Sequence, residues 1–292
     1  MDNISWKHHY LPVFYLKGFT KESGKFKIYN VQKKQFVQKG KDFHPESHFY
    51  EKKSNTIFIP NGESDLIEKF YSDIETTAAK LINKINNADS STRFDVSEED
   101  MPMLNTFMSL IYWRLPANRL ELQKIINNKS ANELGFSIYN TEDNSLNHLA
   151  TEEFKKKEDF IKIYKILTSL YDSIRGLDCR TPYTIIPKHE EFPFLCSDNP
   201  IIFEKEEFPD VHKDDYILPL SGKRFFIKAD IVCKDPYLCI LFDIVIYKQA
   251  IKYVSCTDKD YLRVLDILFE KYDMSLSQLK QLIFKKIKQK NI

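Results

Sequence analysis

The spacing of hydrophobic residues changes three times along this chain of 292 residues, and that order constrains the fold most. Alternation with period two at 25–30, followed by 35–38 after a polar turn, predicts a hairpin inside an irregular, β-rich region from residue 6 to 60. Strand character returns at 183–230. Because strands and helices do not alternate regularly, we predict an α+β fold rather than a doubly wound sheet. Three- and four-residue apolar spacing predicts long amphipathic helices at 64–87, from Ser97 to Pro116, and at 117–128, 151–175, 240–252 and 257–289.

Composition excludes several classes of protein. Hydrophobic residues make up 42% and aromatic residues 14% of the chain, which is too apolar for intrinsic disorder. The 43 Lys and Arg nearly balance the 42 Asp and Glu, so net charge gives no general attraction to nucleic acid or acidic lipid. The five Cys form no CxxC pair, which argues against a zinc knuckle or a disulfide framework. The chain also lacks a membrane-spanning apolar run and the features of a signal peptide at its start. We expect a cytoplasmic protein with no membrane partner.

Two adjacent histidines, His8 and His9, open an aromatic segment near the N-terminus. An imidazole titrates near neutral pH and can act as general acid or base. Neighbouring side chains on a strand point to opposite faces, so the pair is not expected to bind one metal ion. We predict His8 and His9 as catalytic residues and Tyr10 as a substrate contact. The alternative is that both histidines are structural residues beside an aromatic core.

Arg114 and Arg119 stand out because the chain has 36 Lys but only seven Arg. A guanidinium group binds a carboxylate or phosphate through two parallel hydrogen bonds, which an ammonium cannot reproduce. Arg114 also follows Tyr112 and Trp113, where an unpaired charge would be costly. It therefore needs an anionic partner, for which Glu75 and Asp198 are the candidates. We predict Arg114, Arg119 and Glu75 in substrate binding, with a structural ion pair as the alternative.

A polar tetrapeptide, Ser197 to Pro200, interrupts two apolar runs and predicts a tight turn at a strand end. Asp198 at such a strand end can act as a base, a metal ligand or a partner for histidine. We predict Asp198 as catalytic and Asn199 as substrate-binding, with a plain turn as the alternative. A divalent metal is compatible with this site, although the sequence defines no complete ligand set.

The last 22 residues, 271–292, form a basic helical tail with six Lys against one Asp. Such a tail can contact nucleic acid, whereas a solvated helix face is the simpler interpretation. The chain contains no P-loop and no Gly-rich dinucleotide-binding motif.

Several short motifs occur in one order along the chain, and they resemble the domain-of-unknown-function family 4238. Their residues are His8–Pro12 with Phe14–Leu16 and Phe19, then Ile74–Glu75, Arg114–Arg119, Ser197–Pro200, Leu218–Ser221, Gln249–Ala250 and Tyr253–Val254. Two departures are Leu115, where a small polar residue is usual, and Asp243, where Asn is expected. The spread of these motifs implies a single domain over residues 1–292. The resemblance also implies a bacterial protein, for which a role in defence or as a toxin is a hypothesis.

Two functions fit these residues. In the first, the histidines, Asp198 and the two arginines share one cleft of a hydrolase that acts on a phosphate-containing substrate, a nucleotide or nucleic acid. In the second, the same residues form a buried polar network in a non-catalytic binding protein. If these residues form a functional site, substituting them should leave the stability of the folded protein nearly unchanged. If they form a structural network, substituting them should destabilise the protein.

Overall fold

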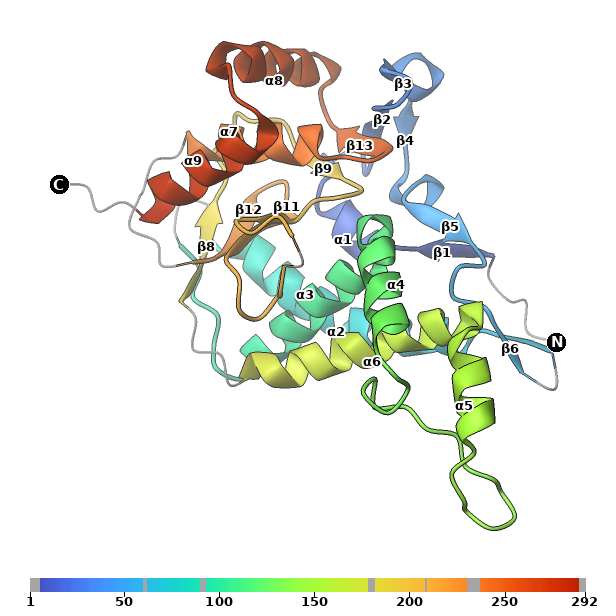
Figure 1. Ribbon diagram of the computed structural model, residues 1–292. Helices are drawn as coiled ribbons and strands as arrows, with labels where there is room; N and C mark the ends of the chain where they lie inside the picture. The colour runs from blue at the N-terminus through green and yellow to red at the C-terminus, as the bar shows by residue number, and fades with distance from the viewer. Residues whose placement is uncertain are drawn as a thin grey trace.

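The computed structural model describes residues 6–59, 62–89, 93–177, 182–207, 209–229 and 237–288. Small antiparallel sheets at the N-terminus precede a group of helices, a second β region and the C-terminal helices (Figure 1). This order confirms the predicted α+β fold. No helix within the described ranges is long and apolar enough to cross a bilayer.

A five-stranded antiparallel sheet joins segments from three distant parts of the chain. Its path is β3-β2-β13-β9, and β4 also pairs with β2. The predicted hairpin is confirmed by the pairing of β2 with β3. The central strand β13 was missed, because its four residues fall between two regions predicted as helical. The strands are β2 (Phe26–Asn30), β3 (Gln35–Phe36), β4 (Asp42–Phe43), β9 (Leu195–Ser197) and β13 (Tyr253–Cys256).

A four-stranded antiparallel sheet separates the two largest groups of core residues. Alternate side chains of its strands face opposite sides. On one side, Leu218 and Phe226 join the core around α3, and on the other, Ile217 and Phe225 join the core around α7 and α9. Burial of both faces explains why these strands are almost continuously apolar. In spatial order the strands are β10 (Ile202–Phe203), β11 (Tyr216–Ser221), β12 (Arg224–Lys228) and β8 (Tyr183–Pro187).

The central helices confirm the predicted periodicity, with two differences at helix ends. The helix predicted from Ser97 begins at Met101, because residues 98–100 form a turn in which the Ser97 side chain accepts from the backbone N–H of Asp100. The helix predicted at 151–175 is two helices with a break between residues 155 and 158. The helices are α2 (Leu66–Asn87), α3 (Met101–Arg114), α4 (Arg119–Asn128), α5 (His148–Lys155) and α6 (Glu158–Leu177).

The C-terminal helices contribute to the core that contains Ile217 and Phe225 of the four-stranded sheet. The helix predicted at 257–289 is broken where Asp273 adopts a left-handed conformation with φ 48°. Leu279, Ile283 and Phe284 of the last helix are buried in the core, so this part of the basic tail is packed against the protein. The helices are α7 (Leu238–Lys248), α8 (Lys259–Tyr272) and α9 (Leu276–Lys288).

Short elements complete the N-terminal half. Strand β1 pairs with β5, and β6 pairs with β7. Their bounds, with those of the short helices, are β1 (Lys7–His9), α1 (Val13–Lys17), η1 (Val37–Gly40), η2 (Pro45–Ser47), β5 (Tyr50–Lys52), β6 (Ile57–Ile59), β7 (Gly62–Ser64) and η3 (Pro116–Asn118).

Candidate functional site

The last residue of α3, Arg114, is buried and bonded to two other parts of the protein. One guanidinium nitrogen pairs with the carboxylate of Glu75 on α2, and another donates to the backbone carbonyl of His9. The guanidinium also lies over the ring of Tyr71, 4.2 Å from its centroid. Of the two partners predicted for Arg114, the structure shows Glu75. The Arg114 guanidinium therefore connects α3 to α2 and β1 through its ion pair, its hydrogen bonds and its stacking on Tyr71.

His8 and His9 point to opposite faces of β1, as the strand pattern predicts. His8 is buried, and its Nδ1 accepts a hydrogen bond of 2.7 Å from the backbone N–H of Asn55. His9 is half-buried, and its Nε2 lies 3.3 Å from the carbonyl oxygen of Glu46. Burial lowers the pKa of His9, with a smaller opposing contribution from that carbonyl. Both imidazoles therefore lie against the protein backbone in this structure.

A small cavity lies beside Arg114 and has a volume of about 10 Å³. Tyr10, which follows β1, and Lys165 of α6 both line it. Burial lowers the pKa of Lys165. A volume of this size holds about one water molecule. It is too small for a phosphate ester. Its other lining residues are Glu51, Ser54, Asn55 and Arg114.

Asp198 binds three consecutive backbone N–H groups with its carboxylate. The donors are Ile251, Lys252 and Tyr253, each at 2.8 Å. Burial raises the pKa of Asp198, and these three donors oppose the rise. Only 3% of the residue is exposed. The carboxylate thus holds the chain between α7 and β13 against the end of β9.

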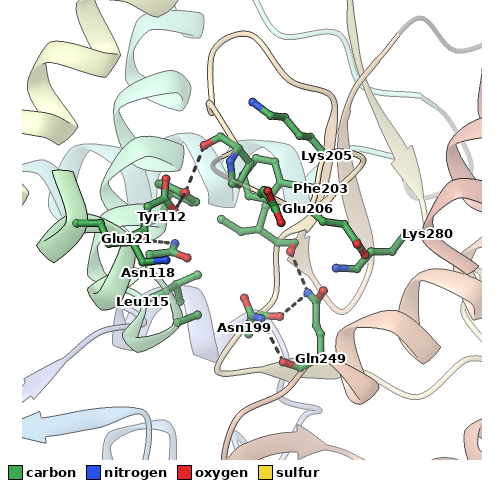
Figure 2. Close-up of a pocket in the computed structure, with 15 residues that line it drawn as sticks. Tyr112, Leu115, Asn118, Glu121, Asn199, Phe203, Lys205, Glu206, Gln249 and Lys280 are labelled. Atoms are coloured by element: carbon green, nitrogen blue, oxygen red, sulfur yellow. Dashed lines mark hydrogen bonds between the residues drawn. The ribbon is translucent and has the colours of Figure 1, made fainter. Parts of the chain in front are cut away.

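A much larger pocket, of about 450 Å³, lies between α4, the segment after β9, β10 and α9. Figure 2 shows side chains from these separate elements converging around it. Three of the sequence motifs meet here, because the segment 114–119, Asn199 and Gln249 each contribute to the lining. The lining residues are Tyr112, Leu115, Ala117, Asn118, Glu121, Lys124, Asn199, Ile201, Phe203, Lys205, Glu206, Glu207, Pro209, Gln249 and Lys280.

Glu121 is the carboxylate of this pocket with the most perturbed environment. It is half-buried, and burial raises its pKa, while a hydrogen bond of 2.6 Å from the Tyr112 hydroxyl opposes the rise. Tyr112 is itself held by Trp113, whose ring centroid lies 4.8 Å away. A carboxylate held in a fixed position can act as a proton acceptor.

Lys280 supplies a positive charge to the pocket from α9. Burial lowers the pKa of its ammonium group, and Glu206 opposes this. Lys124 and Lys205 add two further ammonium groups, and Lys205 lies 3.5 Å from Asp214. Within the described ranges, no group of three His, Cys, Asp or Glu residues could hold a metal ion. Lys124, Lys205 and Lys280 are the cationic side chains that line this pocket.

The family model described as "Protein of unknown function (DUF4238)" matches residues 7–234 of this chain. The chain belongs to the DUF4238 family. No curated protein and no solved structure matches it. The match ends before α7, so Gln249 and Tyr253, which we assigned to the family's closing motif, lie beyond it. Strand β13 and the Gln249 wall of the pocket also follow the residues matched to DUF4238.

The structure places the predicted site residues in three locations instead of one cleft. Arg119 occupies one of these locations by itself. It forms an exposed ion pair of 3.5 Å with Glu158 and lines neither pocket. The catalytic roles of His8, His9 and Asp198 stay predictions. By location, the residues are His8, His9, Tyr10, Glu75 and Arg114 near the small cavity, Asp198 and Asn199 at the turn of the larger pocket, and Arg119 on the surface of α4.

Sequence reasoning missed the pocket residues Glu121, Gln249 and Lys280. Glu121 and Lys280 are ordinary charged residues of amphipathic helices, and only the packing of α4 and α9 brings them to one pocket. One signal was available for Lys280, because it lies four residues before the buried Phe284 and therefore on the same helix face. Gln249 belonged to a motif, but no chemistry pointed to it.

Proposed function

We propose that this member of the DUF4238 family is a hydrolase that acts on a phosphate-containing substrate, a nucleotide or nucleic acid, in the 450 Å³ pocket. The observation that carries the proposal is the combination of Lys280 and Glu121 in one hollow. Lys280 offers charge to a phosphate, and Glu121 offers a proton acceptor with a raised pKa. The volume suits a small organic ligand better than a bare anion.

The proposed reaction is hydrolysis of a phosphate ester. Glu121 takes a proton from a water molecule, whose oxygen forms the new bond to phosphorus while the ester P–O bond breaks. The leaving oxygen receives a proton from the Lys280 ammonium, and the Glu121 proton then returns to Lys280. The Tyr112 hydroxyl positions Glu121. Charge stabilisation by the lysines accompanies this transfer.

A turnover assay with nucleotides and bis(p-nitrophenyl) phosphate, each with and without Mg²⁺, tests the proposal. We expect Glu121→Gln to lower kcat by about 10²–10⁴-fold, the usual contribution of a general base. Lys280→Met should abolish most binding of phosphate-containing ligands. The matched control is Lys285→Met, because Lys285 is an exposed lysine on the same helix. Absence of hydrolysis by wild type, or an unchanged rate in Glu121→Gln, would overturn the proposal.

The second candidate is the non-catalytic binding protein. Arg114 and Asp198 favour it, because two guanidinium nitrogens of Arg114 are bonded to Glu75 and the His9 carbonyl, and both carboxylate oxygens of Asp198 accept from backbone N–H groups. In that case, the pocket binds its ligand without turnover. Calorimetric titration that detects nucleotide binding by a wild-type protein with no hydrolytic activity would favour this function.

A further inference from the structure

Three side-chain amides line the large pocket, and each one uses its nitrogen on a backbone carbonyl. Asn118 donates to the carbonyl of Tyr112 at 2.6 Å, and Asn199 donates to that of Gln249 at 3.2 Å. Gln249 donates to the carbonyls of Asn199 and Ile201, at 2.7 and 2.9 Å. A carbonyl oxygen can only accept a hydrogen bond, so these contacts fix which end of each amide is nitrogen.

The oxygen end of each amide is left without a donor from the described residues. Asn118, Asn199 and Gln249 therefore offer three hydrogen-bond acceptors to whatever fills the pocket. Asn199 and Gln249 are bonded reciprocally, and Figure 2 shows their side chains next to each other. Two neighbouring acceptors suit a ligand that carries two neighbouring donors.

The rest of the pocket restricts what that ligand can be. Phosphate groups carry acceptors, so they suit Lys280 and not the amide oxygens. Vicinal hydroxyl groups of a sugar are the donors that accompany a phosphate in a ribonucleotide. Phe203 and Tyr112 add aromatic surface to the same pocket. A volume of about 450 Å³ has room for a sugar, a base and a phosphate.

We propose that Asn199 and Gln249 accept hydrogen bonds from the vicinal ribose hydroxyls of a ribonucleotide, so that the substrate is a ribonucleotide and not a deoxyribonucleotide. The inference rests on the proposed function, because it uses the phosphate at Lys280 to orient the substrate. It adds a specificity that phosphate binding alone does not give. Both residues act on the sugar, while Glu121 acts at phosphorus.

Calorimetric titration of the wild-type protein with five probes tests this directly. The probes are AMP, dAMP, adenosine, deoxyadenosine and inorganic phosphate. We expect dAMP to bind about 10- to 100-fold more weakly than AMP, since one lost hydroxyl leaves a pocket acceptor unpaired. Equal affinities for AMP and dAMP would overturn the inference, while hydrolysis of both would leave the proposed function intact.

Adenosine separates failure of the inference from failure of the proposed function. If adenosine binds more tightly than deoxyadenosine but no phosphate ester is hydrolysed, the ribose site stands and the hydrolase proposal falls. If no nucleoside or nucleotide binds, both fall. Gln249→Leu then locates the contact, because we expect its AMP to dAMP affinity ratio to fall toward about 1. Should Gln249→Leu not fold, the wild-type comparison alone decides.

Discussion

The two ends of the segment 114–119 differ in how their polar groups are bonded. At one end, Arg114 contacts Glu75, the His9 carbonyl and the Tyr71 ring, and the adjoining cavity holds about one water molecule. At the other end, Asn118 faces a pocket of about 450 Å³ with an amide oxygen that no described residue binds. Two guanidinium nitrogens of Arg114 are therefore bonded within the protein. The amide oxygen of Asn118 has no such partner among the described residues.

Replacing charged residues by Met, one at a time, should separate these two regions, and Arg114→Met should have the largest effect. Met matches the length of the arginine stem but leaves the Glu75 carboxylate without its partner. We expect a loss of about 3 kcal/mol in the free energy of unfolding, as for other broken buried ion pairs. Urea unfolding followed by circular dichroism measures it.

Arg119→Met is the matched control for this change. Arg119 is exposed and its ion pair with Glu158 is on the surface, so we expect a change within about 0.5 kcal/mol. If Arg114→Met were as stable as Arg119→Met, Arg114 would not be the structural residue that its contacts indicate. The predicted role of Arg114 in substrate binding would then be the preferred interpretation.

Much of the fold followed from local sequence, because hydrophobic period depends on neighbouring residues. The period of three to four residues located α2, α4 and α7, and alternation located the hairpin of β2 and β3. Strand β13 was missed because four residues are too short for a period, and its partners β2 and β9 lie far away in the chain. Helix breaks near Lys156 and Asp273 were missed because the apolar spacing continues across them.

The candidate site was harder to predict, since it depends on residues that meet only after folding. The cost of burying a charge correctly indicated a partner for Arg114 and included Glu75 among two candidates. The same argument could not distinguish a structural pair from a ligand site. Asn199 was predicted as substrate-binding and lines the large pocket. Its neighbours in the pocket, Glu121 and Lys280, come from α4 and α9. The sequence of neither helix indicates that the two helices line the same pocket.

A pH experiment at Asp172 should give an intermediate effect. Asp172 lies on α6, and its carboxylate accepts a hydrogen bond of 2.7 Å from the Trp113 indole. Burial raises the pKa of Asp172 to about 6 from its ordinary value of 3.8, while the indole opposes this and Asp210 reinforces it. The folded state therefore binds more protons than the unfolded state between these values. Stability should fall as pH rises from about 4 to 6, by about 2 kcal/mol.

Asp172→Asn should remove that dependence, because Asn still offers an oxygen to the Trp113 indole and carries no charge. We expect the variant to match wild type near pH 4 and to be more stable by about 2 kcal/mol at pH 7.5. Urea unfolding at half-unit steps of pH gives both curves. Parallel curves for the two proteins would show that Asp172 does not carry the shift.

The smallest effect on stability should come from Lys280→Met, and its sign should oppose that of Arg114→Met. Burial lowers the pKa of Lys280, which means that the folded protein disfavours its charge. Met removes that charge and keeps the apolar stem beside Phe284 on α9, so we expect unfolding free energy unchanged or higher by up to about 1 kcal/mol. Lys285→Met, exposed on the same helix, should change it by less than about 0.5 kcal/mol. A loss of several kcal/mol in Lys280→Met would place Lys280 with Arg114 among the residues that hold the fold. A stable variant that no longer binds nucleotide would instead show that the polar groups left free by folding serve the ligand.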